Sequence, residues 1–176
     1  MKRITALATG TAIVAVLGFQ QLEIQTIGDD TAEIKDALRL VIQQDDPVAF
    51  TAADEQCLAK NIYHEAGVED RLGKFAVAQV TLNRLRTKKW GNSMCDVVYA
   101  KAQFSWTLFK KRKNEKPKGA VWDESQAVAH AVLFKSYRVP SLSKATFYHA
   151  SYVQPRWAKT VTKIQQLGQH IFYEKA

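Results

Sequence analysis

The chain has 176 residues, enough for one domain of about 120 residues with extensions, and 47% of its residues are apolar or aromatic. Because it contains no low-complexity tract and no internal repeat, this composition excludes a largely disordered protein. The formal net charge of +8 favours a polyanionic partner, and nucleic acid, an anionic lipid surface or another acidic polymer all qualify.

The first 22 residues form a separate segment. Lys2 and Arg3 precede a stretch without charged residues, Ile4 to Leu22, which is typical of an export signal or a membrane anchor. The leading positive charges predict that the N-terminus stays inside. About half of the stretch is Ala, Gly or Thr, and no clear cleavage site follows it, so residues 1–22 are a signal peptide or an uncleaved signal-anchor.

Residues 23–50 are predicted to form a linker with an amphipathic helix. Its apolar residues follow Asp29 and Asp30 at helical spacing. The polar face mixes acids with Lys35 and Arg39, so packing on the main body is favoured over lying on a membrane.

Residues 51–176 form the predicted globular domain, which is expected to be α+β and mainly helical with a small β element. Thr51 and Asp54 make a plausible capping pair for the first helix. The predicted helices are 52–66, 71–88, 96–101 and 124–136, the last starting at Asp123, and the predicted strands are 146–149 and 170–173. The second helix is apolar almost all round, which predicts the central buried helix.

Glu65 lies near the end of the first helix. Leu58, Ile62 and Ala66 follow the i, i+4, i+8 spacing of a buried stripe, so Glu65 lies within or beside that stripe. Desolvation would raise its pKa and leave a proton to donate near neutral pH, which a glycosidic oxygen needs in order to leave. The alternative is a glutamate at a helix end that rotates into water.

Two cysteines, Cys57 and Cys95, are the only ones in the chain. After export they would form one internal disulfide, and the alternative is two buried free thiols. With four scattered histidines they do not fall into ligand spacing, so neither a metal nor another cofactor is expected.

Much of the positive charge lies in one segment, which is predicted to be a solvated loop. Two interpretations are open: the segment guides the protein electrostatically toward an acidic polymer, or it is simply a soluble surface loop. Its cations are Lys110, Lys111, Arg112, Lys113, Lys116 and Lys118. Because no helix-turn-helix, RNA-binding or zinc-finger pattern accompanies it, nucleic acid is not expected as the partner.

Six blocks in one order give the chain a resemblance to a known family. They are Cys57-Leu58-Ala59 with Ile62-Tyr63-His64-Glu65-Ala66, then Gly73 to Arg84, then Cys95-Asp96-Val97-Val98-Tyr99, then Gln103-Phe104-Ser105, then Ala145 to His149, and Trp157 with Gly168 to Tyr173. Together they resemble the cell wall hydrolases of the spore-cortex-lytic SleB/CwlJ type. The chain departs from the family pattern at His64 and at Gly67-Val68.

The resemblance implies a lysozyme-like domain that cleaves peptidoglycan glycan strands between N-acetylmuramic acid and N-acetylglucosamine, with Glu65 as the essential acid. A lytic transglycosylase is favoured, in which the C6 hydroxyl of muramic acid attacks and Glu65 returns as base. A water-using muramidase would need a second carboxylate, for which Glu69, Asp70 and Asp96 are the nominees. Glu69 is the second catalytic candidate, and its alternative role is to order the loop or cap the next helix.

Sugar binding is expected from Gln103, Phe104, Ser105, Tyr148, His149 and Trp157. Core packing is an equal alternative for Phe104 and Trp157. The N-terminal segment resembles the signal-arrest-release segments of phage endolysins, which predicts an exported, periplasmic monomer tethered to the inner membrane through residues 4–22. A basic, non-catalytic cell-wall binding module is the remaining alternative.

Overall fold

The computed structural model describes residues 49–175, and a compact unit begins at Phe50. The predicted signal or anchor segment, 1–22, and nearly all of the predicted linker, 23–50, lie outside the described residues. Within residues 49–175, no helix combines the length and the apolar character needed to cross a membrane.

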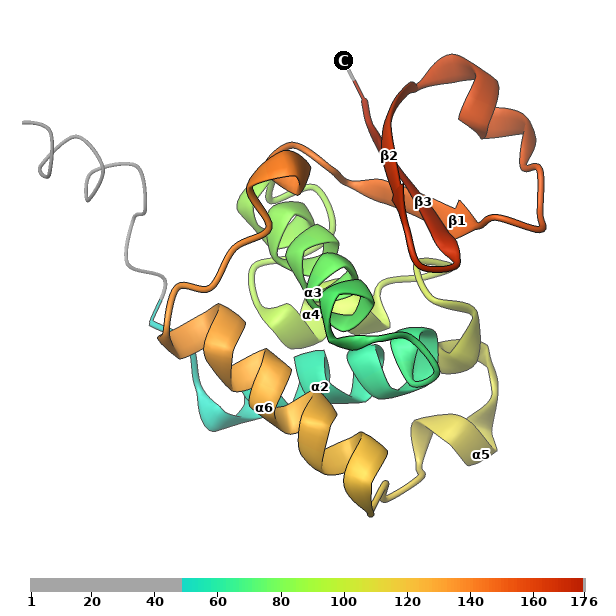
Figure 1. The fold of residues 1–176 in the computed structure, drawn as a ribbon. Coiled ribbons are helices and arrows are strands. Elements are labelled where there is room, and N and C mark those ends of the chain that lie inside the picture. The colour runs from blue at the N-terminus through green and yellow to red at the C-terminus, as the bar shows by residue number, and fades with distance from the viewer. Residues whose placement is uncertain (1–48, 176) are drawn as a thin grey trace, which may run out of the picture. The chain divides into compact units, whose positions relative to one another are not determined.

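The described part is mainly helical with one small sheet (Figure 1). Its longer helices are α2 (Ala52–Ala66), α3 (Arg71–Arg86), α4 (Met94–Tyr99) and α6 (Ala120–Phe134). Short helices are η1 (Ser105–Leu108), α5 (Lys110–Lys113), η2 (Pro140–Leu142) and η3 (Arg156–Thr160). The strands are β1 (Phe147–Ala150), β2 (Thr162–Leu167) and β3 (His170–Glu174).

The start of α2 is fixed twice over. Thr51 and Asp54 form a capping box in which each side chain accepts a hydrogen bond from the backbone N–H of the other, so the predicted cap is confirmed. Asp54 also accepts a 2.9 Å hydrogen bond from the backbone N–H of Met94. The predicted disulfide between Cys57 and Cys95 is present, and it joins α2 to α4.

Helix α3 is the central helix of the domain, as its sequence predicts. Every residue from Gly73 to Leu85 is buried. Its polar side chains find partners inside: the Asn83 amide donates 2.8 Å hydrogen bonds to the carbonyls of Leu142 and Ala145. These bonds fix the path of the chain where it enters β1.

The sheet has the strand order β1-β3-β2 and is antiparallel throughout. Tyr148 pairs with Phe172, and His149 pairs with Ile171. Because side chains alternate along a strand, Tyr148 lies on one face of the sheet and His149 on the other. Strand β2 is not predicted from sequence, since its residues are mostly polar and its register is irregular between Lys163 and Gln165.

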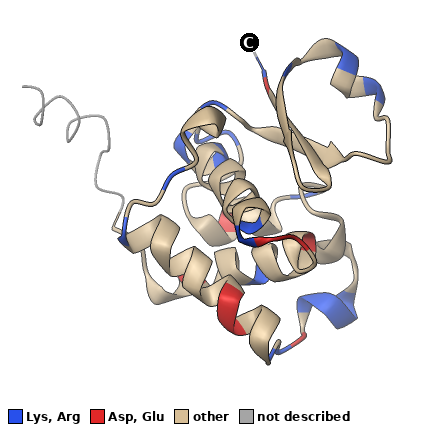
Figure 2. Cartoon of the chain, in the orientation of Figure 1, with Lys and Arg blue, Asp and Glu red and all other residues tan. Residues whose placement is uncertain are grey.

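Three helices differ from the sequence prediction. The helix expected at 96–101 is α4, which begins at Met94 because Ser93 and Asp96 form its capping box. Helix α6 starts at Ala120 instead of following Asp123, because Gly119 enters it with a φ of +88°, which glycine tolerates. The lysine segment, predicted as a loop, contains α5. Lysine and arginine are good helix formers, and Lys60 donates a 3.2 Å hydrogen bond to the carbonyl of Lys113. The cations of α5 stay on the surface (Figure 2).

Candidate active site

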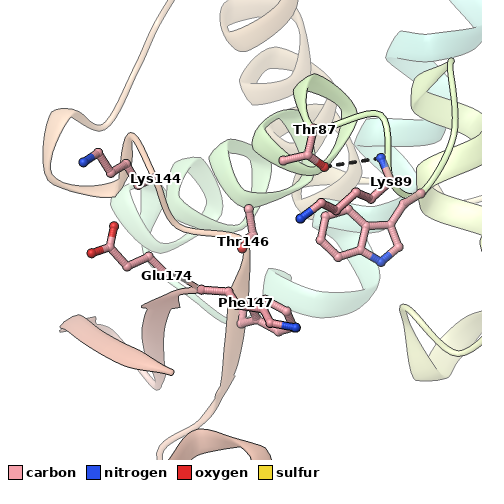
Figure 3. A pocket seen from close by; sticks show the side chains of 8 residues that line it. Thr87, Lys89, Lys144, Thr146, Phe147 and Glu174 are labelled. Atoms are coloured by element: carbon pink, nitrogen blue, oxygen red, sulfur yellow. Dashed lines mark hydrogen bonds between the residues drawn. The ribbon is translucent and has the colours of Figure 1, made fainter. Parts of the chain in front are cut away.

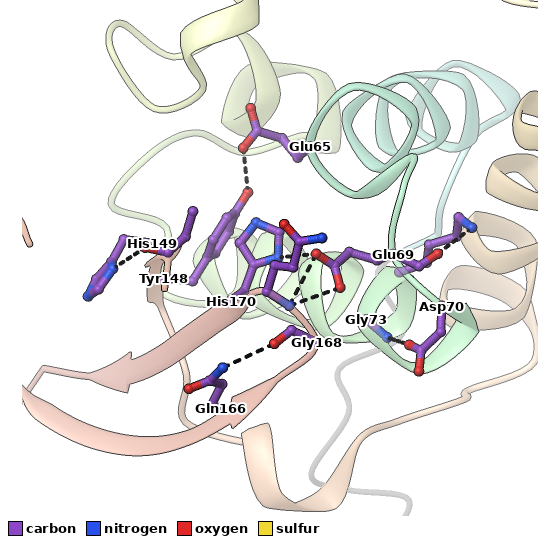
Figure 4. A network of polar contacts seen from close by, with 12 residues as sticks. Glu65, Glu69, Asp70, Gly73, Tyr148, His149, Gln166, Gly168 and His170 are labelled. Atoms are coloured by element: carbon purple, nitrogen blue, oxygen red, sulfur yellow. Dashed lines mark hydrogen bonds and ion pairs between the residues drawn. The ribbon is translucent and has the colours of Figure 1, made fainter. Parts of the chain in front are cut away.

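Glu65 lies in the last turn of α2 and is partly buried. The Tyr148 hydroxyl, on β1, donates a 3.0 Å hydrogen bond to Oε2 of Glu65 (Figure 4). The two residues are 83 positions apart in sequence, and the Asn83 bonds to the segment before β1 help to bring them together.

Burial raises the pKa of the Glu65 carboxyl above its ordinary value. The hydrogen bond from Tyr148 and the charges of Arg84 and Arg112 offset part of this effect by favouring the carboxylate. Burial, the Glu65 charge and their hydrogen bond also raise the pKa of Tyr148 well above its ordinary value, so Tyr148 keeps its proton as a donor. Glu65 is therefore suited to hold and release a proton.

Arg84 connects this pair to the core. The residue is 6% exposed, and its guanidinium carbon lies 5.9 Å from the ring centroid of Tyr148 and 5.0 Å from that of Phe104. Its Nε donates a 2.8 Å hydrogen bond to the carbonyl of Thr146, while Nη1 is buried without a hydrogen-bond partner in the described structure. Burial lowers the pKa of Arg84, and the negative charge of Glu65 partly counteracts this.

Arg84 is absent from the functional residues predicted from the sequence. A charged residue inside a helix that is apolar almost all round was the available signal, because such a charge is seldom buried without a partner or a function.

Glu69 lies in the link between α2 and α3, and its side chain is 3% exposed. The backbone N–H of Gln169, in the turn between β2 and β3, lies 3.1 Å from Oε2 and 3.3 Å from Oε1. Gly73 and Gly168 both face this carboxylate, and a Cβ at Gly168 would overlap it. Glu69 therefore holds the β2–β3 turn against the start of α3.

His170 connects Glu69 to the Glu65–Tyr148 pair. Its Nδ1 lies 3.3 Å from Oε1 of Glu69, and its ring packs edge-on against Tyr148 at 5.1 Å. Burial lowers the pKa of His170, and the Glu69 charge partly opposes that shift. Figure 4 shows the resulting sequence of contacts, from Glu65 through Tyr148 and His170 to Glu69.

Two of the predicted sugar-binding residues, His149 and Trp157, lie on the face of the sheet opposite Tyr148. The Nε2 atom of His149 lies 2.8 Å from the Tyr173 hydroxyl, and the two rings stack at 5.2 Å. Trp157, in η3, lies 5.5 Å from the rings of both His149 and Tyr173. These aromatic side chains form a cluster on the face opposite Tyr148.

The Gln103-Phe104-Ser105 block precedes and begins η1. Phe104 is 2% exposed and packs in the core beneath Arg84, whereas Gln103 is partly exposed and Ser105 is exposed. Asp70 and Asp96 are engaged as helix caps: Asp70 accepts a 2.7 Å hydrogen bond from the Gly73 N–H, and Asp96 completes the capping box of α4.

A pocket of about 390 Å³ opens beside the end of α2. Tyr63, Gly67 and Val68 line it from the α2 side, and Arg112 and Glu115 line it from the α5 side. Glu65 is not one of the lining residues: the pocket opens on the Tyr63 and Gly67 side of this helix end, whereas the Glu65 carboxyl is bonded to Tyr148.

Comparisons with known proteins agree on one family. The profile of the cell wall hydrolases matches residues 68–173, a segment that begins just after Glu65. The spore cortex-lytic enzyme of Oceanobacillus iheyensis is 26% identical over 128 residues, which cover 72% of this chain and 43% of that protein. The spore cortex-lytic enzyme of Bacillus cereus is 26% identical over 129 residues, which cover 72% of this chain and 46% of that protein. The chain thus spans less than half the length of these relatives.

Solved structures show the same fold. The catalytic domain of the germination-specific lytic transglycosylase SleB from Bacillus anthracis superposes with a TM-score of 0.61 at 23% identity, covering 73% of this chain and 99% of that one. The catalytic domain of the Bacillus cereus SleB protein gives a TM-score of 0.58, also at 23% identity, covering 73% and 94%. The mainly helical arrangement with a small sheet is therefore an established fold.

Proposed function

The chain belongs to the cell wall hydrolase family, and we propose that it cleaves the glycan strands of peptidoglycan between N-acetylmuramic acid and N-acetylglucosamine, with Glu65 as the general acid. The observation that carries this proposal is the partly buried carboxyl of Glu65, with its raised pKa and its hydrogen bond from Tyr148. Such a carboxyl retains a proton for the leaving oxygen.

Cleavage begins when Glu65 transfers its proton to the glycosidic oxygen, and the bond from that oxygen to the anomeric carbon breaks. Positive charge then develops on the sugar. The Glu65 carboxylate, stabilised by Tyr148 and by the positive potential of Arg84, next accepts the proton of the muramic acid C6 hydroxyl while that oxygen attacks the anomeric carbon. The products are a 1,6-anhydro end on the muramic acid residue and a free hydroxyl on the leaving sugar.

The intramolecular attack is favoured over attack by water because the other nominated carboxylates have structural partners. Asp70 and Asp96 cap helices, and Glu69 is buried against the β2–β3 turn. We assign Glu69 a positioning role: it holds His170, which packs on Tyr148. A muramidase that uses Glu69 to activate water is the alternative.

Product analysis separates the two reactions. Purified sacculi are digested with the wild-type chain, and the fragments are analysed by mass spectrometry. Ends with the 1,6-anhydro structure support the transglycosylase, whereas reducing ends that have gained a water establish the muramidase. A non-catalytic binding module would release no fragment at all.

The pocket beside α2 is the proposed entrance for the glycan, and Tyr63 supplies an aromatic face there. Gln103 and Ser105 offer neutral polar groups near η1. His149 and Trp157 would contact sugars only if the glycan strand also reaches the face of the sheet opposite Tyr148.

We further propose that the domain works outside the cytoplasm as an exported, periplasmic monomer. The Cys57–Cys95 disulfide supports an oxidising compartment. Tethering to the inner membrane through residues 4–22 remains a proposal from sequence, because these residues lie outside the described part of the chain.

A further inference from the structure

A second pocket, of about 300 Å³, lies at the start of β1 and the end of β3 (Figure 3). It is lined by residues from three separate segments: the link after α3, the approach to β1, and the end of β3. Its lysines are Lys89, Lys144 and Lys175, its aromatic rings are Trp90 and Phe147, and its acid is Glu174. A volume of this size is at the lower end for small-ligand pockets and suits a short, compact group.

The three ammonium groups are available to a ligand. Within residues 49–175, none of them makes an ion pair or a hydrogen bond. A neighbouring hollow of about 220 Å³ shares Lys144. Cations without protein partners around a partly apolar floor are suited to carboxylates on a small organic group.

The floor of the pocket is aromatic. The rings of Trp90 and Phe147 meet edge-on at 6.2 Å, and both residues are partly exposed. An apolar floor would cover the methyl or methylene groups of a ligand, while Glu174 would accept a hydrogen bond from an amine, a group that a polyphosphate lacks. The pocket therefore favours an amino-acid-like ligand with carboxylates over a chain of phosphates.

The pocket is linked to the candidate active site through one residue. The Arg84 guanidinium carbon lies 5.6 Å from the Trp90 ring and 5.9 Å from the Tyr148 ring, and Tyr148 bonds to Glu65. Phe147 and Tyr148 are neighbours on β1, which is an edge strand of the sheet. A stem bound here would reach the pocket from a sugar near Glu65 by passing along this edge strand, and an extended peptide of four residues spans at most about 14 Å.

We propose that this pocket binds the peptide stem of peptidoglycan through the stem's carboxylates. Lys89, Lys144 and Lys175 hold the carboxylates, Trp90 and Phe147 cover the side-chain carbons, and Glu174 receives a free amine where the stem has one. The inference rests on the proposed function for the choice of ligand. It adds that glycan strands bearing stems are better substrates than bare strands.

The first test measures binding without cleavage. A synthetic stem tetrapeptide is titrated into the wild-type chain, and the Trp90 indole N–H is followed by NMR. A saturable shift that is lost in the triple variant Lys89→Gln, Lys144→Gln, Lys175→Gln supports the site, and an unmoved Trp90 signal overturns it. Glu174→Gln should weaken binding of an amine-bearing stem and strengthen binding of polyphosphate. Polyphosphate that competes as well as the stem in the wild type would show an unselective anion site.

The second test measures turnover on intact strands and on strands whose stems an amidase has removed. The triple variant should lose about 3- to 30-fold in kcat/KM on intact strands, because three exposed charge contacts are removed, and should lose nothing on bare strands. A matched control removes the same charge from exposed positions elsewhere, with the substitutions Lys101→Gln, Lys159→Gln and Lys163→Gln. It should leave unchanged the ratio of kcat/KM on intact strands to kcat/KM on bare strands. An equal loss on both substrates overturns the proposal. Failure of the wild type on both strands would count against the proposed function alone, since the binding test does not depend on cleavage.

Discussion

Glu65 draws its chemical character from two features of its position. It lies at the C-terminal end of α2, where the helix dipole disfavours a negative charge, and burial disfavours that charge further. Tyr148 and Arg84 oppose both effects in part. The balance leaves an acid whose pKa is raised but still responsive to its neighbours.

The Tyr148→Phe variant tests this balance. The proton-donating form of Glu65 exists below its pKa, so activity falls as the pH rises through that pKa. Because the Tyr148 hydrogen bond lowers the pKa, its loss should move the alkaline limb of the kcat/KM profile to higher pH and reduce kcat about five- to tenfold. A reduced rate with an unmoved limb would assign Tyr148 a merely structural role.

Glu65→Gln also has a predictable effect on stability. A group whose folded-state pKa is raised loses its stabilising contribution as the pH rises through that pKa. The neutral glutamine escapes this loss, so the variant should unfold at the same or a higher temperature than the wild type at pH 8. Thermal melts followed by circular dichroism measure this and serve as the folding control for every activity comparison.

At the scale of elements, the disulfide and the α2 cap hold α4 against α2. The bridge spans a sequence separation of 38 residues, which corresponds to about 3–4 kcal/mol in the chain-entropy description. The double variant Cys57→Ser, Cys95→Ser should lose about this much unfolding free energy in urea titrations. A loss below about 1 kcal/mol would mean that the core alone fixes the two helices.

A substitution in the turn between β2 and β3 tests how that turn is held against the helices. Gly168 has a φ of +54° and packs directly on the Glu69 carboxylate. Gly168→Ala should displace the turn and His170, lowering both the melting temperature and the activity. The matched control is Gly119→Ala: Gly119 also has a positive φ, +88°, but a Cβ there meets nothing within 4 Å. If both variants lose activity equally, contact with Glu69 does not matter for the site.

Much of the helical framework and two of the three strands could be predicted from the sequence, since the expected segments 146–149 and 170–173 correspond to β1 and β3, but β2 could not. Helix α2 carries a clear apolar stripe and a capping box, and α3 can be recognised as a buried helix because it is apolar almost all round. Strand β2 is largely polar because most of its residues are partly or fully exposed, so it lacks the alternation that marks a strand. Gly119 starts α6 by adopting a positive φ, and that choice of backbone conformation is not visible in a periodic pattern.

The candidate site was predictable only in part, because its geometry depends on contacts between segments that are far apart in sequence. Glu65 and Tyr148 could be nominated from residue type and from family resemblance, but their hydrogen bond depends on how Asn83 and Arg84 hold the segment before β1. The engagement of Asp70 and Asp96 in caps is local and could have been read from sequence spacing. The pairing of Glu69 with a turn 100 residues away could not.

At the scale of the whole molecule, the predicted N-terminal segment would determine where the catalytic domain acts. If residues 4–22 are an uncleaved signal-anchor, the exported protein should keep Met1 and fractionate with the inner membrane until the membrane potential is dissipated. N-terminal sequencing of both fractions, before and after a protonophore, checks this. A new terminus close to Phe19 would indicate ordinary cleavage and secretion.

The most direct test of the account compares wild type and Glu65→Gln on purified sacculi, with fragments quantified by mass spectrometry. The account predicts 1,6-anhydro products from the wild type and a rate at least about 100-fold lower for the folded variant, the scale for removing a general acid. Equal release of fragments by the two proteins would show that Glu65 does not supply the proton on which cleavage depends.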